Sequence, residues 1–345
     1  QPSVLIIGLG ALGVLYGALL SRGGVRVVAY ARSTAAQLEG EGIELRSAKF
    51  GTFTWRPARV VRSDAEARAE AYDYILTTFK LVPELRTISS LIKPVVKPGS
   101  APALVLVQNG IHVEREPHAS LCEGDEPVCS ALISCCAWLG ATLVDGGRAV
   151  DHGGLERLMI GLYPSAEPGE DSPRTRAWRK FVELYAAGGG GAERVENVQA
   201  VRWQKVLWNA CWGGLCLLSR QPVSALLQPD AIRYSAPVVR GLMQECMSVA
   251  RAEGLGADVL PETSVEEAFG LTFEERPMNP ERKGNLKDTF KPSILMDLEA
   301  QRPMELSGIV GNVVSLARRH NLSTPRLDLL LAAIRPAQVA AVRAA

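Results

Sequence analysis

The sequence predicts an α/β domain followed by an all-α C-terminal domain, and three observations carry this prediction. The first 35 residues run through a strand, a glycine-rich turn, a helix and a second strand. Further strands and helices alternate up to about residue 195, and long helical patterns dominate beyond it. A chain of 345 residues has the length of about two domains. We therefore place an α/β domain at 1–195 and an all-helical domain at 196–345.

The first βαβ unit gives the clearest local signal. Residues 4–7 form a continuous β-branched and apolar run, as expected for a strand buried on both faces. A helix is predicted at 14–20 and a second strand at 25–30. The turn between the first strand and the helix reads Gly8, Leu9, Gly10, Ala11, Leu12 and Gly13. A lone G-x-G-x-x-G is weak evidence, but the flanking strand and helix supply the context of a Rossmann-type fold.

The residues around this unit favour NADPH/NADP as the cofactor. The glycines let the backbone approach a pyrophosphate, and the helix N-terminus supplies N–H groups and a positive dipole end. An NAD site usually has an acid after the second strand, whereas this chain has Arg32, Ser33 and Thr34 there. A guanidinium and two hydroxyls suit a 2′-phosphate. The alternatives are a packing turn without ligand and, for Arg32, a solvated surface charge.

The remaining elements follow from periodicity and from turn residues. Strands are predicted at 74–78, 103–107, 128–137 and 141–144, and helices at 83–92 and 177–187. In the second domain, helices are predicted at 198–219, 231–253, 293–300, 304–320 and 327–342. We interpret His152, which precedes two glycines, as a turn residue. The apolar helix 198–219 fits either a core or the interface of a homodimer.

Two polar residues lie just past predicted strands. Lys80 follows the strand 74–78, and Asn109 follows the strand 103–107. Ligands of open α/β sheets bind at the carboxyl ends of the strands. Both residues are therefore candidates for a cofactor or substrate site, with an ordinary turn as the alternative for each.

Lys205 and Asn209 lie four residues apart on the predicted helix 198–219, so they share one face. The surrounding helix is apolar and contains Trp203, Trp208 and Trp212, which we interpret as packing residues. A lysine in such a helix is either a residue that extends its ammonium group to the surface or a buried functional group.

Composition excludes several other classes of protein. Apolar residues make up 47% and charged residues 22%, which is ordinary for a globular chain. The formal net charge of +1 gives no electrostatic footprint for nucleic acid or an anionic membrane. The longest apolar run, 206–218, is too short to span a bilayer. We expect a cytoplasmic protein with no nucleic-acid or membrane partner.

The seven cysteines and four histidines predict no metal site. The number of cysteines is odd, and the sequence contains neither CxxC nor HxxxH nor HExxH spacing. Buried free thiols in a reducing compartment explain the cysteines.

One further segment completes a pattern that spans nearly the whole chain. Ser293 opens a helical stretch, and Glu305 follows twelve residues later at the start of another. In order and spacing, the motifs together resemble the ketopantoate reductase (2-dehydropantoate 2-reductase) family. The motifs that carry the resemblance are the glycine turn 8–13, Arg32, Lys80, Gln108-Asn109-Gly110, Trp203-x-Lys205-x-x-x-Asn209 and the segment 293–305.

The resemblance implies an NADPH-binding Rossmann domain, an all-helical second domain and an active site in the cleft between them. It implies reduction of the ketone of a 2-keto acid to a 2-hydroxy acid, with Lys205 as the general acid and Glu305 bonded to the substrate hydroxyl. The other implied positions are Ser293 at the substrate carboxylate, Asn209 supporting the substrate and the lysine, Asn109 beside the nicotinamide ribose, Arg32 at the 2′-phosphate and Lys80 on the cofactor side.

The chemistry of carbonyl reduction agrees with these roles. Hydride transfer to a carbonyl carbon leaves negative charge on the oxygen, which a protonated lysine stabilises before donating its proton. Desolvation lowers the pKa of a lysine, and a nearby carboxylate raises it. A pairing of Lys205 with Glu305 is therefore our hypothesis for the proton donor.

The sequence departs from the family pattern at positions that bear on the substrate. The family usually has a second asparagine where this chain has Gly213, and a third falls near Val223. The stretch 306–311 lacks the acid and asparagine often found there. A roomier, more apolar pocket would suit a ketone bulkier than ketopantoate, so both substrates stay open.

Two other classes remain as alternatives. β-Hydroxyacid dehydrogenases also join a Rossmann domain to a helical domain and use a lysine, but the segment 293–305 argues against them. A non-catalytic NADPH-binding sensor would have no use for a proton donor, so Lys205 together with Glu305 argues against that interpretation.

Overall fold

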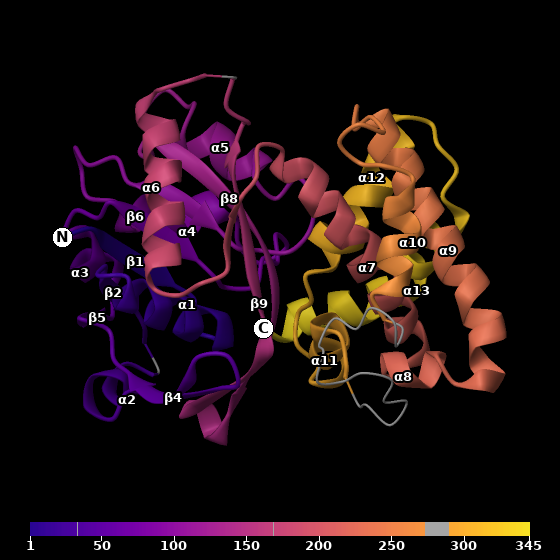
Figure 1. Cartoon of the computed structure of the whole chain (residues 1–345), viewed down its shortest axis with the longest axis horizontal. Coiled ribbons are helices and arrows are strands. Elements are labelled where there is room, and N and C mark those ends of the chain that lie inside the picture. Colours follow the sequence, from indigo (N-terminus) through magenta and orange to yellow (C-terminus); the bar gives the residue numbers. More distant parts are fainter. Residues whose placement is uncertain (33, 168, 273–289) are drawn as a thin grey trace. The chain divides into compact units, whose positions relative to one another are not determined.

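The structure is a computed structural model, and it describes residues 1–32, 34–167, 169–272 and 290–345. Contacts divide the chain into two compact units (Figure 1). The division falls after Val198, three residues beyond the predicted boundary. Two short segments within the first 195 residues group with the second unit, which no local pattern indicates. Unit 1 comprises Gln1–Lys80, Arg86–Gln108 and Glu114–Val198, and unit 2 comprises Leu81–Leu85, Asn109–Val113 and Gln199–Ala345.

Unit 1 is built on a ten-stranded mixed sheet. The strand order is β4-β3-β9-β8-β7-β6-β1-β2-β5, and β10 pairs with β9. The strands are β1 (Ser3–Ile7), β2 (Arg26–Tyr30), β3 (Ile43–Ser47), β4 (Gly51–Trp55), β5 (Arg59–Val61), β6 (Tyr74–Thr77), β7 (Ala103–Leu106), β8 (Ala131–Val144), β9 (Ala149–Tyr163) and β10 (Ala192–Arg194). All five residues of β1 are buried, and β1 runs parallel to both β2 and β6. The predicted Rossmann-type α/β domain is confirmed, with the antiparallel pairs β3–β4 and β8–β9 added to its parallel strands.

The helices of unit 1 lie against this sheet. Helices α1 (Ala11–Arg22) and α6 (Pro173–Ala187) pack together through Tyr16 and Tyr185, whose ring centroids are 5.7 Å apart. The indole of Trp178 fixes α6 to the sheet by donating to the Ile160 carbonyl at 3.0 Å. The remaining helices are α2 (Ala35–Gly40), α3 (Asp64–Arg68), α4 (Ile88–Ile92), η1 (Lys93–Val95), α5 (Arg115–Leu121) and η2 (Asp145–Gly147).

Three local predictions in unit 1 are wrong in detail. The two strands expected at 128–137 and 141–144 form the single strand β8, because the register shift at Gly140 makes a bulge rather than a turn. His152 lies buried within β9, where Ser47 Oγ approaches its ring at 2.7 Å and the ring stacks on Phe50. The helix expected at 83–92 begins only at α4, after the N-cap Thr87.

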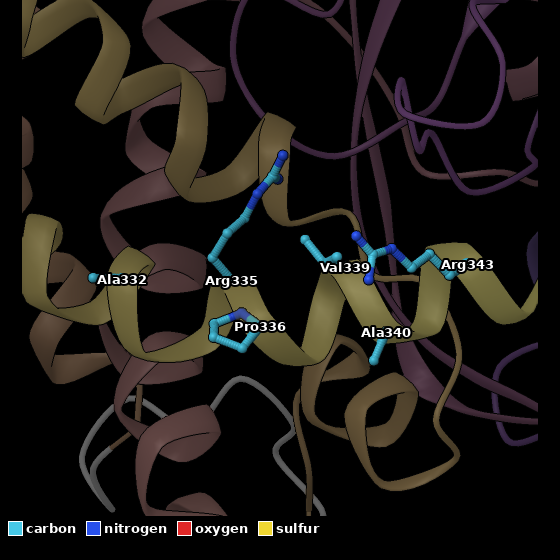
Figure 2. A pocket seen from close by; sticks show the side chains of 6 residues that line it. All are labelled: Ala332, Arg335, Pro336, Val339, Ala340 and Arg343. Carbon is cyan, nitrogen blue, oxygen red and sulfur yellow. The ribbon is translucent and has the colours of Figure 1, made fainter.

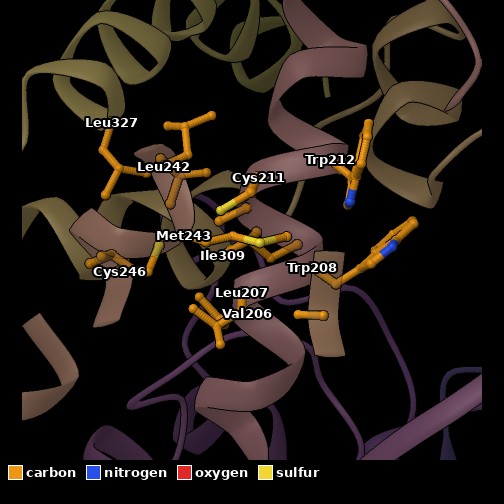
Figure 3. Packing of buried hydrophobic residues seen from close by; sticks show 14 of the residues in the cluster. Val206, Leu207, Trp208, Cys211, Trp212, Leu242, Met243, Cys246, Ile309 and Leu327 are labelled. Atoms are coloured by element: carbon orange, nitrogen blue, oxygen red, sulfur yellow. The ribbon is translucent and has the colours of Figure 1, made fainter. Parts of the chain in front are cut away.

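Unit 2 is all-helical, as predicted. Its elements are α7 (Val198–Ser219), α8 (Val223–Leu226), α9 (Pro229–Ala252), α10 (Thr263–Gly270), α11 (Ser293–Glu299), the π-helical turn η4 (Ser307–Gly311), α12 (Asn312–Arg319) and α13 (Pro325–Ala344). Helix α7 supplies much of the core, where Trp203 is buried together with Trp208 and Trp212. Figure 3 shows Trp208 and Trp212 within this core. The sequence interpretation of these tryptophans as packing residues is therefore confirmed.

The cysteines agree with the expectation of buried free thiols. All seven cysteines are free thiols, and all except the half-buried Cys122 are buried. Burial raises the pKa of Cys122 to about 11 and that of Cys216 to about 12. Within the described residues, no helix has the length and hydropathy needed to cross a bilayer.

Candidate active site

The glycine turn after β1 is shaped by close backbone contacts. Gly8 has a φ of +106°, and a Cβ there would lie 2.3 Å from the Phe79 nitrogen. A Cβ at Gly13 would lie 2.1 Å from the Gly8 carbonyl oxygen, and the Thr78 hydroxyl donates to the same oxygen. Both positions require glycine, since any side chain would push β1, α1 and the end of β6 apart.

The N-terminus of α1 fits a bound pyrophosphate. Its N-cap is Gly10, which has extended backbone and no capping side chain, and the first turn contains no acid. A Cβ at Gly10 would meet no atom within 4 Å. The first backbone N–H groups of α1, at Ala11 and Leu12, lack acceptors within the helix, and the dipole favours an anion beside them. Leu9, half-buried, completes the predicted turn.

Two arginines act electrostatically on Tyr30, the last residue of β2. Arg32 is exposed and lies two residues after β2, whereas Ser33 lies outside the described residues. Burial and the hydrogen bond to Asp64 raise the pKa of Tyr30, and the charges of Arg32 and Arg86 oppose that rise. Both guanidinium groups therefore act on the same end of β2. Sequence reasoning missed Arg86 because its proximity to β2 is a long-range contact.

A buried glutamine holds together the ends of β6 and β7. Gln108 receives a hydrogen bond from the Thr77 hydroxyl at 3.1 Å and donates to the Phe79 carbonyl at 3.1 Å. Two predicted site residues come directly after the residues of the second contact in the sequence. Lys80 follows Phe79 and is exposed, and Asn109 follows Gln108. Gln108 thus fixes the backbone from which both side chains extend.

Three predicted site residues meet in unit 2. Lys205 on α7 donates through Nζ to Asn109 Oδ1 at 2.7 Å. Asn109 donates through Nδ2 to Glu305 Oε2 at 3.0 Å, and Glu305 is only 7% exposed. The hypothesis that Lys205 and Glu305 lie close together is supported, with Asn109 as the link between them. A carboxylate only accepts hydrogen bonds, so Glu305 fixes the orientation of the Asn109 amide and turns Oδ1 towards Lys205.

The segment Asn109–Val113, called the Asn109 loop below, is bonded through its backbone to the rest of unit 2. Arg202 donates to the Gly110 carbonyl at 2.9 Å, and Asn312 donates to the Ile111 carbonyl at 2.7 Å. The Ile111 nitrogen donates to the Gly308 carbonyl at 3.1 Å, in the π-helical turn η4. A Cβ at Gly110 would lie 2.4 Å from Gly308, so these two backbones touch. π-Helical turns are frequent at functional sites, and this one begins two residues after Glu305.

Glu305 is positioned by a buried glutamine from α13. Gln338 is fully buried, and its amide receives a hydrogen bond from the Met304 nitrogen at 2.9 Å and donates to the Met304 carbonyl at 3.0 Å. Met304 directly precedes Glu305, so the direction of the Glu305 side chain depends on this contact. Sequence reasoning missed Gln338, because a lone glutamine in a helix carries no local signal.

Removing this contact is expected to destabilise the fold. Gln338→Leu leaves the N–H and C=O of Met304 buried without partners, which costs on the order of 2–3 kcal/mol of unfolding free energy. Urea unfolding measures the change, and Gln244→Leu on the exposed face of α9 is the matched control. Equal unfolding free energies for the two variants would show that Gln338 contributes nothing to the stability of this segment.

Two predicted substrate residues stand apart from this network. Asn209 is half-buried one turn after Lys205, and Ser293 is exposed at the start of α11. In the described part of the chain, neither side chain hydrogen-bonds to Lys205, Asn109 or Glu305.

Gly213 and Gly214, in the middle of α7, have different surroundings. A Cβ at Gly214 would lie 2.2 Å from Leu330 Cδ1, so a side chain there would displace the end of Leu330 where α13 packs against α7. A Cβ at Gly213 would meet Ile294 and Pro292 only at ordinary contact distances of 3.7 and 3.8 Å. Packing therefore does not demand glycine at Gly213, and the missing side chain leaves an apolar surface beside α11.

A separate hollow of about 620 Å³ lies along α13 (Figure 2). It is lined by Ala332, Arg335, Pro336, Val339, Ala340 and Arg343. None of the predicted site residues lines it, and Arg335 forms an ion pair with Glu84 at 2.7 Å. The hollow is therefore distinct from the Lys205 network. Among the described residues, no group of three histidine, cysteine or acidic side chains could hold a metal ion.

Comparison with known proteins identifies the family. The family model of ketopantoate reductase PanE/ApbA matches residues 4–165, and the model of its C-terminal domain matches residues 197–338. The chain belongs to the ketopantoate reductase family. The resemblance inferred from the glycine turn, Lys205 and Glu305 is thereby confirmed.

Solved structures and curated relatives agree with the ketopantoate reductase family. A crystal structure of 2-dehydropantoate 2-reductase from Methylococcus capsulatus is 33% identical, covers 98% of this chain and 97% of its own, and has a TM-score of 0.78. An uncharacterized protein from Saccharomyces cerevisiae is 28% identical over 95% of this chain and 91% of its own. A ternary structure of D-mandelate dehydrogenase with NADH and anilino(oxo)acetate is 18% identical, covers 98% of both chains and has a TM-score of 0.76, which shows the fold alone.

Proposed function

We propose that the protein is an NADPH-dependent reductase that converts a 2-keto acid, ketopantoate or a related ketone, to the 2-hydroxy acid. The observation that carries this proposal is the chain of hydrogen bonds from Lys205 through Asn109 to Glu305. Three segments that lie far apart in the sequence converge on this one polar arrangement. A lysine, an amide and a carboxylate in this order suit delivery of a proton to a carbonyl oxygen.

In this proposal Lys205 is the general acid. Reduction of a ketone places negative charge on its oxygen, and an ammonium group at that oxygen stabilises the charge and then gives up a proton. Asn109 accepts one N–H of Lys205 and so fixes where the remaining protons point. Glu305, fixed through the Gln338 contact at Met304, holds the Asn109 amide in that orientation. The side chains of Asn209 and Ser293 are assigned to the substrate.

The glycine turn of unit 1 is assigned to the cofactor. Residues Gly8–Gly13 and the N-terminus of α1 would hold the pyrophosphate, and Arg32 would pair with the 2′-phosphate. When bound, reduced nicotinamide supplies the hydride for the carbonyl carbon. Lys80 is assigned to the cofactor side because it follows β6 at the carboxyl edge of the sheet.

The choice of NADPH over NADH depends on Arg32. Arg32→Ala is expected to raise the KM for NADPH about tenfold or more, because a charge-assisted hydrogen bond to a phosphate is lost. The KM for NADH is expected to stay nearly unchanged. Initial rates at varied cofactor concentrations measure both values, and Arg56→Ala, another exposed arginine of unit 1, is the control. Parallel increases for both cofactors would contradict the assignment of Arg32 to the 2′-phosphate.

A ketone bulkier than ketopantoate is the second candidate substrate. Gly213 favours it, because this buried position two turns after Lys205 has no side chain where α7 meets Ile294. Oxidation of NADPH by the purified protein with ketopantoate, and with 2-keto acids that carry larger apolar groups, separates the two. The substrate with the higher kcat/KM identifies the preferred class of ketone. NADPH binding without turnover of any ketone would support the sensor alternative instead.

A further inference from the structure

A cluster of charged side chains in unit 2 contacts the Asn109 loop and is not used in the mechanism above. Glu253 Oε2 lies 3.2 Å from His112 Nε2. The other oxygen of Glu253 lies 2.6 Å from His320 Nε2 and 3.4 Å from a guanidinium nitrogen of Arg319. The Glu253 side chain is 9% exposed and that of His112 is 13% exposed. The nearly buried carboxylate of Glu253, at the end of α9, therefore joins the Asn109 loop to the end of α12.

Both partners of the central contact occupy positions that are locally unfavourable. Glu253 is the C-cap of α9, where the helix dipole disfavours a negative charge. His112 has a φ of +56°, a left-handed conformation that glycine adopts far more readily than histidine. Local stability would favour different residues at both positions. Departures from local preference of this kind concentrate where a side chain serves a function.

His112 makes the last of the contacts that hold the loop in place after Asn109. The backbones of Gly110 and Ile111 are already bonded to Arg202, Gly308 and Asn312. His112 is the next residue of the loop, and its contact is made by the side chain. The loop is therefore fixed at three consecutive positions immediately after Asn109.

We propose that Glu253 anchors His112 and thereby positions Asn109 between Lys205 and Glu305. His112 and Glu253 are positioning residues, because they act through the loop rather than on the substrate. This inference rests on the proposed function, in which Asn109 orients Lys205. His320 and Arg319 compensate the charge of Glu253 and hold its carboxylate in place.

The decisive variant is His112→Gly, which relieves the left-handed backbone and removes the anchor. We expect kcat to fall about tenfold, since small displacements of a catalytic group cost one to two orders of magnitude in rate. The KM for NADPH is expected to stay unchanged, and the melting temperature to stay near that of the wild type. His112→Gln, which keeps an N–H donor at a similar reach, is expected to retain most of kcat.

The matched control is Gln301→Gly. Gln301 has a φ of +54° and is exposed, so this variant relieves the same backbone conformation outside the cluster. We expect it to leave kcat unchanged. The double variant His112→Gly/Glu253→Gln is expected to lose no more activity than His112→Gly, because both changes break one contact. If His112→Gly does not fold, the same measurements are made on Glu253→Gln instead.

Amide hydrogen exchange separates failure of this inference from failure of the proposed function. Exchange in residues 109–113 is expected to be faster in His112→Gly than in the wild type or Gln301→Gly, whether or not the protein reduces a ketone. Unchanged exchange together with unchanged kcat would overturn the inference. Absence of ketone reduction in the wild type, with faster loop exchange in the variant, would overturn the proposed function and leave the anchor in place.

Discussion

Lys205→Ala is expected to lower kcat by about two to four orders of magnitude, the range of a lost general acid. Without the ammonium group, nothing at the Nζ position stabilises charge on the carbonyl oxygen or supplies its proton. The glycine turn, Arg32 and Lys80, which are assigned to the cofactor, lie in unit 1, whereas Lys205 lies on α7 of unit 2. Binding of NADPH is therefore expected to survive the substitution.

Rates of NADPH oxidation and a fluorescence titration of NADPH binding measure the two effects separately. Lys180→Ala, an exposed lysine of α6 that pairs with Glu183, is the matched control and is expected to behave as the wild type. Lys205→Arg keeps the positive charge but yields its proton far less readily, so partial activity is expected. A Lys205→Ala enzyme with more than about a tenth of the wild-type kcat would remove Lys205 from the chemical step.

Asn109→Asp is expected to have the second-largest effect. The substitution changes a single group, so that an oxygen replaces the Nδ2 that donates to Glu305 at 3.0 Å. The new carboxylate then faces that of the buried Glu305, and the pair is expected to bind a shared proton. The orientation of Lys205 is lost when that proton is absent, so kcat should fall about a hundredfold at pH 8.

The pH dependence of this variant follows from the sign of the pKa shift. Repulsion raises the pKa of the pair in the folded state above its unfolded value, so the folded state binds more protons at neutral pH. Stability and activity are therefore expected to recover as the pH falls towards about 5.5 and to decline as it rises. Asn321→Asp, at an exposed asparagine after α12, is the control and should show no such recovery. An Asn109→Asp variant with the wild-type pH profile would contradict the role of Asn109 as the link.

The features that the sequence predicts well are local. The strand, the glycine turn and α1 are adjacent in the chain, and their spacing alone predicts the βαβ unit that the structure shows. Helix α7 was predicted with its observed bounds because its apolar period continues for 22 residues. The choice of Lys205 and Glu305, by contrast, required the order of motifs along the whole chain.

The features that the sequence could not give depend on contacts between distant segments. Asn109 was identified, but its place between Lys205 and Glu305 depends on how the loop 109–113 joins unit 2. Gln338 and Glu253 act on Met304 and His112 through tertiary contacts, so neither has a local pattern. His152 was wrongly interpreted because adjacent glycines favour a turn, whereas pairing of β9 with both β3 and β8 outweighs that preference.

The most direct test of the central claim is the product of the wild-type reaction. The purified protein is incubated with NADPH and ketopantoate or a bulkier 2-keto acid, and mass spectrometry follows the ketone while absorbance follows NADPH. The account predicts a 2-hydroxy acid, heavier than its ketone by one hydrogen molecule, formed in step with NADPH oxidation and absent with Lys205→Ala. Tight NADPH binding with no reduced product from any ketone would contradict it.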